Sequence, residues 1–248
     1  MRGLPDIDAR YWLLLLTASV CGTNLGDFAS ETLRLGFFGA FVPFTLLFLA
    51  MVFAAGRIRF MSEAYYWLAI LISRASATDI ADLATHQLRL SYPMLLVAAL
   101  AALALALAIG ARLGQSTIAT APGADGRLVS RPAANATYWV AMIMASAFGT
   151  MAGDFLADEL GFGFARAALG SVALAGFAVT ETLSRGKISK LGYWGVVLAV
   201  RVAATNFGDF AAGDGGLGLG FVISSLASFT LLALFTLTWR PQRLAQAS

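Results

Sequence analysis

One stretch decides how this chain folds: Gly22-Thr23-Asn24-Leu25-Gly26-Asp27-Phe28, which recurs in three further versions. The copies are GTMAGDF at 149–155, ATNFGDF at 204–210 and the more divergent ATDIADL at 77–83. A constant interval between two unrelated landmarks indicates duplication, so the chain contains four repeats. The landmarks are a Tyr-Trp pair and the motif Asp, always 16 residues from Tyr to Asp: Tyr11 to Asp27, Tyr66 to Asp82, Tyr138 to Asp154 and Tyr193 to Asp209.

The composition indicates the class of protein. Of the 248 residues, 59% are hydrophobic and only 12% are charged, and the mean hydropathy is +0.77. These values fall outside the range of soluble domains. Apolar runs of about 20 residues, the length that crosses a bilayer core, occur throughout the chain. We therefore predict an integral membrane protein whose partner is the lipid bilayer.

Several kinds of site are excluded by simple counts. The single cysteine, Cys21, excludes an intramolecular disulfide, and the single histidine, His86, excludes a bis-histidine haem or a histidine-rich metal cage. No cofactor is expected. The net charge of +3 is spread over segments that flank apolar runs, so nucleic acid is not an expected partner. The N-terminus lacks the basic region and short apolar core of a removable signal peptide.

Each repeat is predicted to form two membrane-spanning helices joined by a short hairpin. The predicted fold class is therefore all-α, a polytopic membrane protein with eight transmembrane helices. A Gly-Phe pair begins three of the second helices, and glycine suits a tight turn because it tolerates positive φ. The first helices are expected at about 11–30, 66–85, 138–157 and 193–211, and the second helices at about 37–56, 92–110, 164–184 and 221–239.

The four repeats are themselves related in pairs. Repeats one and three carry Ser19 and Ser146 eight residues before the motif Asp, whereas repeats two and four carry Arg74 and Arg201 there. The pattern is a duplicated pair, A-B-A′-B′. Because each repeat has an even number of spans, all copies share one orientation and are expected to be related by an axis along the membrane normal.

The paired repeats predict the domain organisation. The first half is expected at 1–112 and the second half at 138–248, each with four transmembrane helices. The segment 113–137 between them is rich in Ala, Gly, Ser, Thr and Pro. We predict that it is a flexible cytoplasmic linker.

The basic residues predict the orientation. The positive-inside rule places both termini and all links between repeats in the cytoplasm, and the Gly-Asp motifs toward the outer side. The Tyr-Trp pairs are then expected to act as aromatic anchors at the inner interface. The hairpins within repeats hold Arg34, Arg89 and Arg166; the termini and links hold Arg2, Arg10, Arg57, Arg59, Arg112, Arg127, Arg131, Arg185, Lys187, Lys190, Arg240 and Arg243.

Polar residues on each first helix follow a spacing of four. A step of four rotates by only about 40° around an α-helix, so each set forms one stripe on one face. We predict that the polar first helices pack together around a common axis and that the apolar second helices lie outside. The stripes are Ser19-Thr23-Asp27, Arg74-Thr78-Asp82, Ser146-Thr150-Asp154 and Arg201-Thr205-Asp209.

The stripes carry more carboxylates than positive charges. Four motif aspartates face only Arg74 and Arg201, and Asp79 adds a fifth acid. Ionised groups in a bilayer are costly, so the arginines are expected to pair with the aspartates. The surplus carboxylates must bind cations, hold protons or reach water. Carboxylate, hydroxyl and amide oxygens, the last from Asn24 and Asn206, suit hard cations such as Na⁺, Mg²⁺, Ca²⁺ or Mn²⁺.

These features favour a transporter or channel for a small hard cation or for protons. The alternative is a non-transporting membrane scaffold or sensor whose Arg-Asp network is purely structural. A third interpretation places each Gly-Asp motif in water at the end of its helix. An enzyme is not expected, because the sequence shows no nucleophile-base pair and no nucleotide-binding loop. The predicted ion-binding or pathway residues are Asp27, Asp82, Asp154, Asp209, Thr23, Thr78, Thr150, Thr205, Asn24, Asn206, Asp79, Arg74 and Arg201.

The motifs resemble a family of bacterial membrane proteins built from tandem two-helix repeats of unknown function. The resemblance rests on the Tyr-Trp start, the Gly-Thr-x-x-Gly-Asp core and the Gly-x-Gly-Phe hairpin, and it covers nearly the whole chain. Repeat two departs from it, with Ala81 in place of glycine and Ser91-Tyr92 in place of Gly-Phe. The resemblance implies a multi-pass protein of the bacterial inner membrane and carries no activity with it.

Overall fold

The computed structural model describes residues 3–58, 62–122, 128–186 and 188–238. Within them the chain forms eight long α-helices, three π-helical turns and one small sheet. The helices are α1 (Ala9–Asp27), α2 (Gly36–Ile58), α3 (Glu63–Asp82), α4 (Tyr92–Arg112), α5 (Ala136–Asp154), α6 (Gly163–Ser184), α7 (Lys190–Ala212) and α8 (Gly220–Thr238). The π-helical turns are η1 (Phe28–Thr32), η2 (Leu83–Gln87) and η3 (Phe155–Glu159), and the strands are β1 (Ile118–Pro122) and β2 (Leu128–Pro132).

The helices of each repeat lie within a few residues of the predicted spans, apart from the end of the last one at Trp239, which lies outside the described residues. Each first helix begins at a capping side chain, which accepts a hydrogen bond from the backbone N–H three residues further on. Such caps satisfy one of the free N–H groups at a helix start. The capping residues are Asp8, Ser62, Asn135 and Ser189.

The eight helices form an inner and an outer layer. The inner helices α1, α3, α5 and α7 pack on one another in a closed ring in that order, and each outer helix packs on the inner helix of the next repeat. Thus α2 packs on α3, α4 on α5, α6 on α7, and α8 on α1. In their apolar segments 56% of α5 and 61% of α7 is buried, against 17–22% of the outer helices. The polar stripes therefore lie inside the bundle.

Six of the helices are long and apolar enough to cross a membrane: α2, α4, α5 with its π-helical turn, α6, α7 and α8. The other two, α1 and α3, lie in the inner ring and carry more polar residues. This length and composition identify an α-helical membrane protein.

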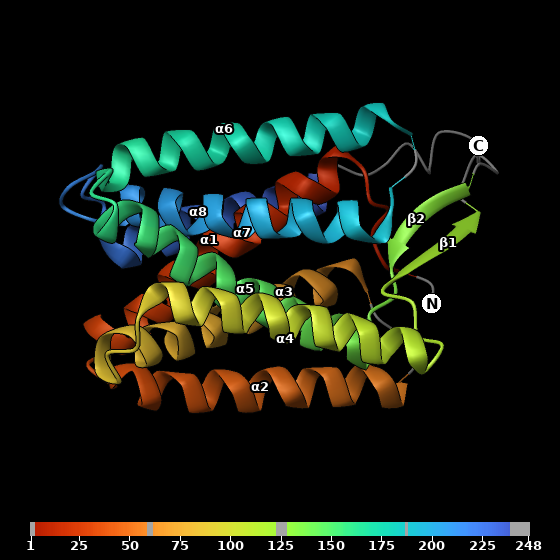
Figure 1. Cartoon of the computed structure of the whole chain (residues 1–248), viewed down its shortest axis with the longest axis horizontal. Helices are drawn as coiled ribbons and strands as arrows, with labels where there is room; N and C mark the ends of the chain where they lie inside the picture. Colours follow the sequence, from red (N-terminus) through yellow and green to blue (C-terminus); the bar gives the residue numbers. More distant parts are fainter. Residues whose placement is uncertain (1–2, 59–61, 123–127, 187, 239–248) are drawn as a thin grey trace.

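The connections divide the bundle into two ends (Figure 1). The four connections within repeats gather at one end, here called the hairpin end. The strands, the ends of α2 and α6 and the starts of α3 and α7 lie at the opposite end, here called the link end. Several basic residues used to predict the orientation lie outside the described residues: Arg2, Arg59, Arg127, Lys187, Arg240 and Arg243.

The segment between the two halves differs from the flexible linker predicted by its composition. Its strands β1 and β2 pair antiparallel, with Ile118 opposite Pro132. The backbone N–H of Ile7 donates to the Ser130 carbonyl over 2.8 Å, and Arg131 forms an ion pair of 2.5 Å with Asp6. The prediction failed because pairing with a distant N-terminal segment leaves no mark in the local composition.

In each half, a glycine allows the two inner helices to approach closely. A Cβ atom on Gly22 of α1 would lie 2.6 Å from the carbonyl oxygen of Leu71 on α3. A Cβ atom on Gly149 of α5 would lie 2.5 Å from the Cβ and 2.8 Å from the carbonyl carbon of Arg201 on α7. Backbone cannot yield as a flexible side chain can, so both positions require glycine. Small residues at such crossings permit close packing of membrane helices.

We therefore expect Gly149→Ala to lower the free energy of unfolding by about 1–3 kcal/mol, the usual cost of overpacking. The matched control is Gly176→Ala on α6, where a new Cβ would contact nothing within 4 Å. Unfolding of both variants in one detergent, followed by tryptophan fluorescence, checks this. Equal stability of the two variants would contradict the close α5–α7 crossing.

Candidate functional site

The inner helices bring the four polar stripes together along one axis, in levels. At the link end the four motif tyrosines, all with no exposed surface, meet in a closed ring of hydrogen-bonded hydroxyl groups. The oxygen–oxygen distances around the ring are 2.9 Å for Tyr11–Tyr66, 2.5 Å for Tyr66–Tyr138, 3.1 Å for Tyr138–Tyr193 and 2.6 Å for Tyr193–Tyr11. This tyrosine ring closes the axis.

The tyrosine ring overturns the expectation that the Tyr-Trp pairs anchor the protein at the membrane interface. The tryptophan beside each tyrosine is also at least 97% buried, and each stacks edge-on against its neighbouring tyrosine with ring centroids 4.9–5.2 Å apart. The prediction failed because a Tyr-Trp pair at a helix start is typical of the membrane–water interface. Only the packing of the four inner helices into a ring buries these pairs.

Two turns further along the axis lie the two arginines, both fully buried. Arg74 of α3 bonds to each of the other three inner helices. Its Nε donates to the Thr23 hydroxyl over 2.9 Å, its Nη1 to the Ser146 carbonyl over 2.5 Å, and its Nη2 to the Thr205 hydroxyl over 2.5 Å. One planar guanidinium thus joins four helices.

Arg201 of α7 is less completely bonded. It donates to the Ser19 hydroxyl over 2.7 Å and to the Met142 sulfur over 2.9 Å, while its Nε has no partner among the described residues. The predicted pairing of the arginines with the motif aspartates is not found: no described carboxylate lies within ion-pair distance of Arg74 or Arg201. The reason is length, since eight residues of helix separate the two levels by about 12 Å.

The threonine level lies between the arginines and the aspartates, and its hydroxyl groups serve the bundle itself. Thr23 and Thr205 accept from Arg74, as described above. Thr78 and Thr150 lie opposite each other, with their hydroxyl oxygens 3.4 Å apart. All four side chains are buried, so the axis is filled at this level.

Beyond the threonines the axis opens at the hairpin end into a cavity of about 300 Å³. All four motif aspartates line it, as the stripes predicted. Asp27 and Asp82 are only 8% and 7% exposed, and Asp154 and Asp209 are half-buried. We call this the acidic cavity; its other lining residues are Glu31, His86, Asp158, Gly213, Phe37, Phe164 and Phe221.

The spacing of four also predicts the additional charged residues of the acidic cavity. Glu31, His86 and Asp158 each follow a motif Asp by four residues, so they continue the stripes by one more step. Gly213 holds the same place in repeat four. The step crosses from α-helix to π-helix in the first three repeats, because η1, η2 and η3 begin directly after the Asp. Such π-helical turns are frequent at functional sites.

Three other predicted residues lie away from the acidic cavity. Asn24 donates to the Ser224 hydroxyl of α8 over 2.5 Å, and Asn206 to the Ser171 hydroxyl of α6 over 3.2 Å. Asp79 occupies the same place in repeat two, fully buried, and neither of its carboxylate oxygens has a partner among the described residues. These positions precede the motif Asp by three residues, which turns them about 60° off the stripe.

The spacing of the acids bears on the kind of ion. Among the described residues, no three His, Cys, Asp or Glu side chains are grouped closely enough to hold a metal ion. The six carboxylates that line the acidic cavity come instead from all four inner helices and from the turns η1 and η3. The site therefore carries the negative charge that attracts a cation, but it lacks the closely grouped ligands that would coordinate a bare metal ion.

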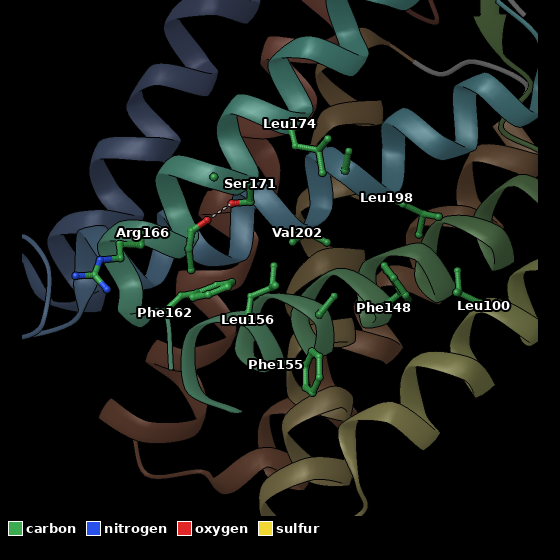
Figure 2. Close-up of a pocket in the computed structure, with 14 residues that line it drawn as sticks. Leu100, Phe148, Phe155, Leu156, Phe162, Arg166, Ser171, Leu174, Leu198 and Val202 are labelled. Atoms are coloured by element: carbon green, nitrogen blue, oxygen red, sulfur yellow. Dashed lines mark hydrogen bonds between the residues drawn. The ribbon is translucent and has the colours of Figure 1, made fainter. Parts of the chain in front are cut away.

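A larger cavity of about 610 Å³ lies on the flank of the bundle (Figure 2). Its lining is apolar apart from Ser171 and Arg166, which Figure 2 shows at one edge with its guanidinium directed away from the other lining residues. Ser171 donates back to its own helix. Convergent polar groups mark functional sites, so the acidic cavity is the better candidate.

Comparison with known proteins gives one match, which covers a single repeat. Residues 137–186, which are repeat three from α5 through α6, match the family model described as a Repeat of Unknown Function (DUF347). No curated protein and no solved structure was found to be similar. The matched residues include Tyr138 of the tyrosine ring, Thr150 of the threonine level, and Asp154 and Asp158 of the acidic cavity. This match to a repeat of unknown function fits the uncharacterised repeat-containing family that the motifs resemble.

Proposed function

We propose that this protein transports a cation or protons across the membrane, and that the acidic cavity is the binding site. The observation that carries the proposal is the set of six carboxylates on the walls of one cavity, with no Lys or Arg among the described residues that line it. Asp27 and Asp82 are the critical pair, because they are more than nine-tenths buried.

The physical argument concerns solvation. A buried carboxylate without a hydrogen bond or an ion pair is costly, and the cost is removed by a bound cation or a proton. Neither the Asp27 nor the Asp82 side chain has a hydrogen bond or ion pair to any described residue. A site whose buried carboxylates are stabilised by a mobile positive charge, and that opens at one end, meets the elementary requirement of a cation carrier.

The proposed topology has all eight helices crossing the bilayer, in four repeats of one orientation. Both termini lie in the cytoplasm by the positive-inside rule, so the acidic cavity faces outward. The arginine level and the tyrosine ring then close the cytoplasmic side of the axis. In this interpretation the structure is an outward-facing state, and transport requires these two levels to separate.

The second candidate function is a non-transporting scaffold or sensor. One observation favours it: Arg74 is bonded to all three neighbouring inner helices, which is suited to holding a sealed bundle together. In that case the acidic cavity would be an external vestibule, and its acids would contribute nothing to ion movement.

Flux measurements in proteoliposomes separate the two. We expect the intact chain to move at least one of H⁺, Na⁺, K⁺, Mg²⁺ and Mn²⁺, and Asp27→Asn/Asp154→Asn to reduce that flux by about tenfold or more, equivalent to 1.4 kcal/mol of lost binding. The matched control is Asp214→Asn, an exposed acid in the α7–α8 connection outside the acidic cavity. Flux that survives in the double variant at the control level would refute the proposed site. No flux with any of these cations or with an organic ammonium ion would favour the scaffold.

A further inference from the structure

We propose that the acidic cavity selects a short organic dication, a linear alkane with an ammonium group at each end, over a bare metal ion. The inference deepens the proposed function, because it names the substrate class of the same site. It rests on the size of the cavity, the levels of its carboxylates and its aromatic walls.

Size argues against a bare ion. A water molecule occupies about 30 Å³ in the liquid, so a cavity of about 300 Å³ holds roughly ten. Mg²⁺ or Ca²⁺ needs six or more oxygen ligands at about 2.0–2.6 Å. The carboxylates are not grouped in this way among the described residues. A larger cation that reaches several walls at once fits better.

The carboxylates are arranged in two levels. The inner level holds the four motif aspartates, and the outer level holds Glu31 and Asp158, four residues further along α1–η1 and α5–η3. Four residues of α-helix rise by about 6 Å, which is the upper limit here because the step runs through the wider and flatter π-helical turns η1 and η3. The two nitrogens of butane-1,4-diamine are separated by about the same length, so one ammonium can reach each level. The charge-assisted hydrogen bonds of an ammonium to carboxylates are strong.

Aromatic rings complete the walls. Phe37, Phe164 and Phe221 come from three outer helices, each following a hairpin glycine. The centroid of the Phe37 ring lies 5.9 Å from that of the His86 ring. A Cβ atom on Gly213 would lie 3.3 Å from the Phe164 ring. Both phenylalanine rings therefore pack against the hairpin of the next repeat. Aromatic faces attract ammonium groups and pack against methylenes, which a hydrated metal ion cannot use.

The inner level of carboxylates gives a second, independent reason to expect a bound ligand. Asp27 and Asp82 line the acidic cavity at 8% and 7% exposure, without a hydrogen-bond or ion-pair partner among the described residues. One ammonium group at the inner level would meet both. The second ammonium would remain at the outer level beside Glu31 and Asp158, near the mouth.

Calorimetry on the purified full chain in lipid nanodiscs tests the inference. The probes are butane-1,4-diamine, butylamine with the same chain and one charge, Na⁺ and Mg²⁺. We expect the diamine to bind at least tenfold more tightly than butylamine, and to be displaced by Mg²⁺ only at much higher concentration. Glu31→Gln/Asp158→Asn should abolish the preference for diamine over butylamine while butylamine still binds. Asp214→Asn, outside the acidic cavity, should leave both affinities unchanged.

The outcomes separate this inference from the proposed function. Equal affinity for diamine and butylamine, or tighter binding of Mg²⁺, overturns the dication. If diamine binding is absent while Asp27-dependent flux of an inorganic cation is measured, the dication fails and transport stands. If the diamine binds with the expected preference but neither it nor any inorganic cation crosses the membrane, the ligand class stands and transport fails. A Phe164→Leu/Phe221→Leu variant that binds diamine as tightly as the intact chain would refute the aromatic contribution.

Discussion

Replacing Arg74 by alanine is expected to lower the free energy of unfolding by about 3 kcal/mol or more, the range for emptying a large buried site and removing charged hydrogen bonds. Arg74 has no exposed surface, and its guanidinium donates to Thr23 of α1, Ser146 of α5 and Thr205 of α7. Its loss leaves a cavity where four helices meet and removes the positive charge nearest to the motif aspartates.

Two comparison variants identify the cause. Arg74→Lys should recover less than half of the loss, because one ammonium group cannot reproduce a planar fork that reaches three helices. Arg201→Ala should cost less than Arg74→Ala, since Arg201 makes fewer hydrogen bonds and its Nε has no partner among the described residues. Thermal unfolding of all three variants in the same detergent measures this. A lysine variant as stable as the intact chain would show that the three-way geometry contributes nothing.

The second large effect is expected at the tyrosine ring. Tyr11→Ala should destabilise the protein by about 3–5 kcal/mol, the usual cost of truncating a fully buried aromatic ring. The Tyr11 hydroxyl lies 2.9 Å from that of Tyr66 and 2.6 Å from that of Tyr193, and its ring packs 5.3 Å from Trp67 between centroids. The alanine variant therefore loses packing and leaves two buried hydroxyl groups short of a partner.

Tyr11→Phe separates packing from hydrogen bonding. It keeps the ring and removes only the hydroxyl, so we expect a loss of about 1–2 kcal/mol. Chemical denaturation of both variants, compared with the intact chain, measures the difference. If the phenylalanine variant were as unstable as the alanine variant, the hydrogen-bonded ring would dominate and packing would be secondary. If both were as stable as the intact chain, the closed tyrosine ring would be refuted.

The arginine level and the tyrosine ring also define what transport would require. In the described part of the chain the axis is filled by buried side chains from the tyrosines to the threonines, and it opens into a cavity at the carboxylates. Any ion that leaves the acidic cavity toward the link end must pass the two positive charges. Separation of the two halves is the simplest route. Among the described inner-helix crossings, those where an added Cβ would lie within 3.0 Å of the facing helix are within halves, at Gly22, Gly149 and Gly153, whereas Gly208 of α7 faces the Asn24 side chain of α1 at 3.2 Å across the halves.

The residues of this chain by themselves determined the helices and which of them are polar. Apolar runs of membrane length, the hairpin glycines and the step of four are local properties, and local hydrogen bonding and hydropathy decide helices. The stripes likewise predicted that Asp27, Asp82, Asp154 and Asp209 would share one place. The same step of four, carried once further, would have added Glu31, His86 and Asp158.

The tertiary structure alone decided which groups meet across helices. The Tyr-Trp pairs were predicted to be interfacial anchors, but the ring of inner helices buries them. The arginines were predicted to pair with the aspartates, but no described carboxylate lies within ion-pair distance of them. Asn24 and Asn206 shared the motif with the aspartates but face the outer helices. The offset of about 60° of the asparagines and the rise of about 12 Å between the arginines and the aspartates follow from the helix alone. Which neighbouring helix each of these side chains meets depends on how the helices pack, and a periodic pattern in one chain segment does not encode that.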